Sequence, residues 1–113
     1  MQQRSLDALS ETKEIPAKET ILKEAERLTN QDRRATYGHP LDNFTRTANL
    51  FNAQFAHKLK EPFTAEDIEI AMVLVKLARQ AHKPQRDNLV DACGYLNLVD
   101  MTERERERRS SER

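Results

Sequence analysis

Two aspartates, Asp87 and Asp91, stand four residues apart in a segment whose residues favour a helix. This spacing places both carboxylates on one face of the helix, one turn apart. Mg²⁺ is commonly held by one or two carboxylates together with phosphate oxygens of a substrate. The pair therefore predicts a Mg²⁺ site with Asp87 and Asp91 as ligands. The structural alternative is that Asp87 caps the helix and Asp91 pairs with a lysine.

Gly94 and Tyr95 continue the same helix. A glycine inside a helix costs about 1 kcal/mol relative to alanine, so we expect close approach of another helix or of a ligand to compensate. We expect Tyr95, beside the aspartate face, to contact the ligand. The residues expected to point into the core are Leu89, Cys93, Leu96 and Val99.

Lys76 and Arg79 lie three residues apart near the end of the preceding predicted helix, so they share a face. Arg79 falls within an apolar stripe, where an unpaired charge is costly. A phosphate group or the two aspartates would be suitable partners. The alternative is that the Arg79 side chain extends to water from the end of the helix.

Residues 31–46, a loop followed by the start of a helix, form a second cluster of candidate binding residues. Gly38 and Pro40 shape the turn because glycine tolerates positive φ and proline fixes its own φ. Shaped polar loops between rigid elements often carry binding residues. We expect ligand contacts here from Arg33, Arg34, Tyr37 and His39, and metal or sugar contacts from Asp42 and Asn43. The alternative is that Asp42 or Asn43 only caps the following helix and that Tyr37 and His39 pack on the turn.

Four predicted helices must position these side chains. They cover residues 17–29, 41–60, 65–82 and 86–101, and residues 64–67 supply an Asp version of the capping box. Abundant Ala, Leu, Glu, Lys and Arg and only two glycines favour an all-α fold. Short links suggest a small up-and-down bundle with disordered or extended termini.

Two of these helices are strongly apolar. In residues 41–60, apolar residues recur at spacings of three and four and predict one buried stripe, formed by Leu41, Phe44, Ala48, Phe51, Phe55 and Leu59. In residues 65–82 the expected buried face is wide, which predicts the most buried helix, through Ile68, Ile70, Ala71, Met72, Leu74, Val75, Leu77 and Ala78. This excess of apolar residues favours a homo-oligomer, such as a dimer.

Composition limits the class of protein. The 113 residues include 19 basic and 19 acidic side chains, and this balance argues against a nucleic-acid partner. A single cysteine, the lack of a long apolar run and a polar N-terminus predict a cytoplasmic protein without membrane association. We predict a disordered segment at residues 1–18, a helical domain at 19–101 and a charged tail at 102–113. The tail either extends the last helix or is disordered.

The order of these motifs resembles a family. Arg34…Tyr37-Gly38…Asn43-Phe44, then Lys76-Leu77-Ala78-Arg79, then Asp87-Asn88…Asp91…Gly94-Tyr95, is similar to a group of small phage and prophage proteins of unknown function. That group is similar to a phage domain associated with nucleotide modification. More distantly, it resembles the all-α nucleoside triphosphate pyrophosphohydrolases, the MazG and dimeric dUTPase-like enzymes.

The resemblance implies a nucleotide or a nucleotide-like phosphate ligand, and metal-assisted hydrolysis of a phosphoanhydride if the protein is an enzyme. Those enzymes hold Mg²⁺ with two acidic motifs, and Asp87 and Asp91 match only the later one, at a changed spacing. Where the earlier motif is expected, this chain has Lys76 and Arg79, which favours direct contact with phosphate. Two non-enzymatic alternatives remain open: a protein that sequesters a nucleotide signal, and a helical module that binds another protein.

Overall fold

The computed structural model describes residues 19–112, and within them every regular element is a helix. This confirms the all-α prediction. The predictions for residues 1–18, including the start of the first helix at residue 17, lie outside the described residues. No helix in the described part of the chain combines the length and hydropathy required to cross a bilayer.

The chain begins with a helical segment that changes its winding. The α2 helix, Ile21–Arg27, is capped by Thr20 and passes directly into a π-helical turn, η1, at Leu28–Asp32. The short α3 helix, Arg33–Tyr37, follows. Gly38, with φ of +77°, then makes the turn that only glycine adopts without strain.

The α4 helix covers Pro40–Phe55 and is capped by His39, whose ring nitrogen accepts a hydrogen bond from the backbone N–H of Leu41 at 3.0 Å. The alternative in which Asp42 or Asn43 caps this helix is therefore wrong. The predicted end at residue 60 is also too late, because the chain tightens into the 3₁₀ turn η2, Ala56–Lys58. Asn52 holds the returning loop through two hydrogen bonds with the backbone of Phe63.

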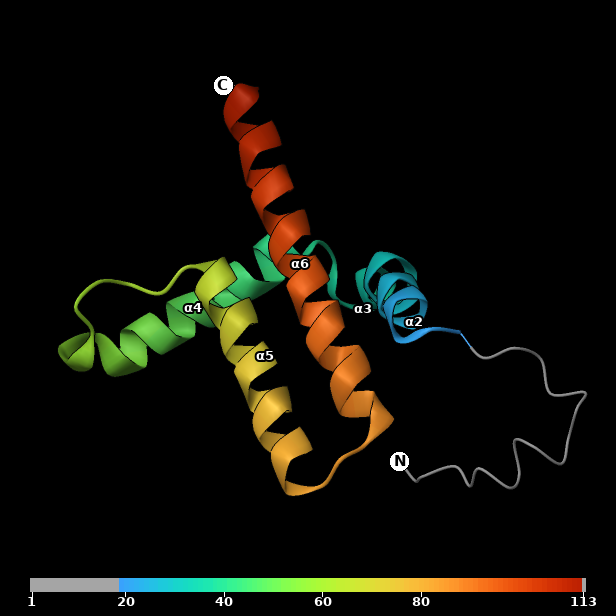
Figure 1. The fold of residues 1–113 in the computed structure, drawn as a ribbon. Helices are drawn as coiled ribbons and strands as arrows, with labels where there is room; N and C mark the ends of the chain where they lie inside the picture. Colours follow the sequence, from blue (N-terminus) through green and yellow to red (C-terminus); the bar gives the residue numbers. More distant parts are fainter. Residues whose placement is uncertain (1–18, 113) are drawn as a thin grey trace, which may run out of the picture.

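The α5 helix, Ala65–His82, and the α6 helix, Arg86–Ser111, form an antiparallel hairpin (Figure 1). The predicted capping box is present, since Thr64 and Asp67 satisfy each other's backbone N–H groups. The α4 helix crosses this hairpin, and α2 and α3 lie on the other side of α6 from α5 (Figure 1). The core between α4, α5 and α6 contains Leu41, Phe44, Ala48, Ala65, Ile68 and Leu98.

The buried faces of α5 and α6 differ from the prediction. On α5 the buried face contains Ile68, Glu69 and Val73, whereas Ile70, Leu74 and Leu77 are exposed. On α6, Leu89 and Leu96 are exposed and Cys93 is only half-buried. The physical reason is that α6 lies between two neighbours, α2 and α5. Its buried face therefore contains the polar residues that mediate those contacts, and apolar spacing alone does not identify it.

The apolar stripe of α4 is buried only in its first half. Leu41, Phe44 and Ala48 are buried, whereas Phe51 and Phe55 are 42% and 38% exposed because the second half of α4 extends past the hairpin (Figure 1).

The charged C-terminal segment continues α6 without a break to Ser111. Thr102 is fully buried, and its hydroxyl donates a hydrogen bond of 2.6 Å to the carboxylate of Glu69. Farther along, Arg106 pairs with Glu66 of α5 and Arg109 pairs with Asp42 of α4. Of the two sequence alternatives, the extended helix is the one observed, and its basic residues bind acidic residues of the same chain.

Candidate functional site

A pocket of about 320 Å³ opens between the N-terminal helical segment and the middle of α6. Its wall combines apolar, aromatic and charged side chains. The lining residues are Ala25, Leu28, Thr29, Arg33, Thr36, Tyr37, Val90, Asp91, Gly94, Tyr95 and Leu98. This volume lies within the range of about 300–1,000 Å³ that is common for small-molecule sites. The pocket contains Arg33, Tyr37, Asp91 and Tyr95 from the predicted site residues.

Close packing of η1 against α6 forms one side of the pocket. The hydroxyl of Thr29 donates to the carbonyl of Ala25 and accepts from the Asn97 amide at 2.7 Å. A Cβ atom at Gly94 would lie 3.3 Å from the methyl carbon of Thr29, so glycine permits this approach. The structural interpretation of Gly94 is thus confirmed. Single π turns within helices are frequent at functional sites, and η1 contributes Leu28 and Thr29 to the pocket.

Arg33 lies among three aromatic rings. Its guanidinium carbon is 4.5 Å from the ring centre of Tyr37, 4.9 Å from that of Phe44 and 6.0 Å from that of Tyr95. One N–H donates to the side-chain oxygen of Asn43 at 3.0 Å. Cation–π contacts and this hydrogen bond fix the guanidinium, so the positive charge has a defined position in the pocket wall.

Asp91 contributes a negative charge to the same pocket. Its Oδ2 lies 3.0 Å from the Nζ of Lys76, which reaches across from α5. The alternative that Asp91 pairs with a lysine is therefore confirmed. Asp87 is exposed in the first turn of α6 and does not line the pocket. Among residues 19–112, no three His, Cys, Asp or Glu side chains group together as metal ligands.

The remaining predicted contact residues do not line the pocket. Arg34 and Arg79 are exposed and do not line the pocket. Asn43 holds Arg33 and so contributes indirectly. His39 caps α4, and its Nε2 is 4.0 Å from a carboxylate oxygen of Glu105. Burial and the nearby Arg34 lower the pKa of His39 below its usual value.

The sequence named Arg33 and Arg34 together as ligand contacts and assigned no role to Thr29 or Glu69. Arg33 and Arg34 are adjacent, and only the helical phase of α3 decides which of them faces the aromatic rings. Glu69 is fully buried on α5, and one of its carboxylate oxygens has no hydrogen-bond partner in the described structure. Burial raises the pKa of Glu69 to about 7. A glutamate flanked by isoleucines gave no signal that it would face the core.

Comparison with known proteins shows the family. Residues 20–103 match the model described as "Domain of unknown function (DUF6378)". The chain is 36% identical over 85 residues to the Gene 55 protein of Mycobacterium phage D29, covering 73% of this chain and 52% of that protein. It is 34% identical over 82 residues to the Gene 55 protein of Mycobacterium phage L5, covering 72% of this chain and 51% of that protein.

The chain thus spans about half the length of these curated relatives. No solved structure matches it. The resemblance to phage proteins of unknown function is confirmed, and the more distant likeness to nucleotide enzymes stays a prediction. Because the family model covers most of the helical region, the chain belongs to the DUF6378 family, a domain of unknown function with relatives among phage proteins.

Proposed function

We propose that this chain binds a nucleotide or a nucleotide-like phosphate ligand in the pocket between η1, α3 and α6. The observation that carries the proposal is the presence of Arg33, Tyr37 and Tyr95 in one pocket of suitable size. Tyrosine rings offer flat faces for a base, and stacking of this kind contributes about 1–3 kcal/mol per base. The fixed guanidinium of Arg33 is suited to bind phosphate oxygens through more than one N–H group.

Asp91 adds a carboxylate to the pocket wall, and Lys76, which does not line the pocket, pairs with it. The Asp91 carboxylate can accept hydrogen bonds from sugar hydroxyl groups while it remains paired with Lys76 at 3.0 Å. The same pairing makes Asp91 a poor ligand for Mg²⁺, because the lysine already neutralises it. The described residues therefore fit a protein-held metal poorly, and we propose binding without a metal-dependent step. In this proposal, Mg²⁺ is bound by the phosphate groups of the ligand and not by side chains of the protein.

A thermal-shift screen tests this proposal. The purified chain is heated with nucleoside mono-, di- and triphosphates and with cyclic dinucleotides, each with and without Mg²⁺. A ligand that binds only the folded protein at 100 times its Kd adds about 2.7 kcal/mol to the free energy of unfolding. For a domain of this size we expect a rise in Tm of several degrees.

Arg33 and Arg34 provide a matched pair of variants. We expect Arg33→Gln to weaken binding of the ligand found in the screen by about tenfold or more, because a charge-assisted hydrogen bond to phosphate contributes about 1.5–3 kcal/mol. Arg34→Gln should leave the affinity within about twofold, because Arg34 does not line the pocket. A screen without a ligand, or equal losses in the two variants, would contradict the proposal. Product analysis after long incubation with excess Mg²⁺ separates binding from turnover.

A further inference from the structure

The α5 helix carries a row of apolar side chains on the face that points away from α4 and α6. Ile70, Leu74 and Leu77 are 45%, 61% and 49% exposed, and Ala81 follows in the same row. We call these four residues the α5 stripe. Their spacings of four, three and four are those of the seam between two helices of a coiled coil.

The opposite face of α5 is already covered within the chain. Ile68 lies in the core, Glu69 binds Thr102 of α6, and Lys76 binds Asp91 of α6. An apolar face of a helix is typically buried against another element. Within the described part of the chain, however, the α5 stripe has solvent in front of it. Rows of exposed apolar residues of this kind mark protein interaction sites.

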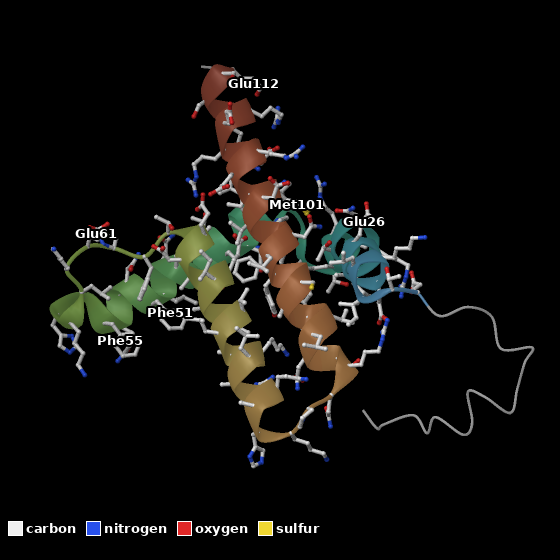
Figure 2. The ribbon with its side chains drawn as sticks, in the orientation of Figure 1. Glu26, Phe51, Phe55, Glu61, Met101 and Glu112 are labelled. Carbon is white, nitrogen blue, oxygen red and sulfur yellow. The ribbon has the colours of Figure 1, made fainter. Side chains whose placement is uncertain are left out.

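The projecting half of α4 carries two further exposed apolar side chains. Phe51 and Phe55 are 42% and 38% exposed, and their rings contact each other in a tilted arrangement with ring centres 6.0 Å apart. Figure 2 shows both phenylalanines on the edge of α4 that faces the angle between α4 and α5.

We propose that the α5 stripe is the interface of a homodimer in which the α5 helices of two copies pack antiparallel. A twofold axis between Leu74 and Leu77 would set Leu74 of each copy opposite Leu77 of the other and Ile70 opposite Ala81. Interfaces of this kind are self-complementary, because each copy offers the same patch to the other. The stripe satisfies that condition with large side chains at its centre and a small one at one end.

The charges at the two ends of α5 select the antiparallel direction. Asp67 is exposed at the first turn, and His82 and Lys83 are exposed at the end. An antiparallel pair brings Asp67 of one copy within about one turn of His82 and Lys83 of the other. It also aligns the two helix dipoles favourably. A parallel pair would instead bring the Asp67 side chains of the two copies together, and likewise the two Lys83 side chains.

Sedimentation equilibrium of the full chain tests the interface. The parent should be dimeric, and Leu74→Glu should raise the dimer dissociation constant by at least about 100-fold, because the twofold axis places two charges in the apolar seam. The control is Leu96→Glu, which replaces a leucine that is 54% exposed on α6, outside the stripe. Helix content and Tm, measured for each variant, verify folding. A monomeric parent, or equal dissociation of both variants, would overturn the proposal.

Cysteine cross-linking tests the direction of the helices. In a Cys93→Ser background, Ile70→Cys mixed with Ala81→Cys should give a disulfide-linked dimer, because only antiparallel packing brings these positions together. Ile70→Cys alone should stay unlinked, because position 70 of one copy would lie about 16 Å from position 70 of the other along the helix axis. Linking of Ile70→Cys to itself without linking to Ala81→Cys would overturn the antiparallel arrangement.

Discussion

The two sides of the α5–α6 hairpin use polar and apolar residues in opposite ways. On the α2 side, polar groups are partly or fully buried, and they bind one another, as Thr29 binds Asn97. On the free side of α5, apolar groups such as Leu74 are exposed and have no cover among residues 19–112. Buried polar groups need partners of defined geometry, so the first side makes a specific pocket. Apolar groups need only a matching apolar surface, so the second side suits a partner molecule.

This contrast separates two roles within a short chain. The pocket side is closed by contacts within one copy, so its affinity for a small ligand should not depend on protein concentration. The free side of α5 should make the oligomeric state depend on concentration.

The largest effect is expected in the core between α4, α5 and α6. Leu98 is 1% exposed, lines the pocket and belongs to the core with Phe44 and Ile68. Leu98→Ala should lower the free energy of unfolding by about 2–5 kcal/mol, because it removes buried methyl groups and leaves a cavity. Leu96→Ala, at an exposed site two residues away, should cost less than about 1 kcal/mol. Urea denaturation measures both, and similar costs would contradict the assigned phase of α6.

A pH-dependent effect is expected from Glu69, whose buried carboxyl has a pKa of about 7. The folded protein keeps this proton up to about pH 7, whereas the unfolded chain releases it near the ordinary value of 4.5. The folded state thus binds more protons in this window, and the free energy of unfolding falls as the pH rises from 4.5 to about 7. The contribution is on the order of 3 kcal/mol.

Glu69→Gln should remove this dependence because an amide does not titrate there. Denaturant titrations of parent and variant over the same pH range measure the difference, which cancels the opposing contribution of His39, whose pKa is lowered. Glu103→Gln, at an exposed position of α6, is the control and should retain the parent's slope. An unchanged slope in Glu69→Gln would show that the carboxyl is not kept protonated by burial.

Close packing on the pocket side should make Gly94 sensitive to volume. Gly94→Val should destabilise the protein by about 1–3 kcal/mol, since the new side chain would overlap Thr29. Ala53→Val, at an exposed position of α4, should cost only the helix propensity difference, roughly 0.7 kcal/mol or less. Thermal unfolding compares the two. If both variants cost the same, the contact between η1 and α6 is looser than described.

The smallest effect is expected from the ion pair at the pocket edge. A double-mutant cycle with Lys76→Met and Asp91→Asn should give a coupling energy of about 0.2–1 kcal/mol, because the pair is partly exposed. Added salt should reduce this coupling. No measurable coupling would mean that Asp91 is available to a ligand without competition from Lys76.

The sequence itself determined most of the helices, although the predicted end of the first helix at residue 29 was wrong, because η1 and α3 continue the helical winding to Tyr37. Periodic apolar residues, the Thr64 capping box and the turn at Gly38 and Pro40 are local signals, and the structure contains helices in the regions that they predict. The structural interpretations of Gly94 and Asp91 could also be stated in advance, because a glycine inside a helix and a charged pair one turn apart have few physical explanations.

Tertiary packing decided which faces of these helices are buried. A helix with a wide apolar face, such as α5, can turn more than one face toward the core, and only the position of α6 selected the face that carries Glu69 and Lys76. The same packing turned Arg33 rather than Arg34 toward the aromatic rings. It also left the α5 stripe exposed. Local sequence sets the phase of residues within one helix, whereas contacts between distant helices fix how each helix is rotated, and those contacts define the pocket.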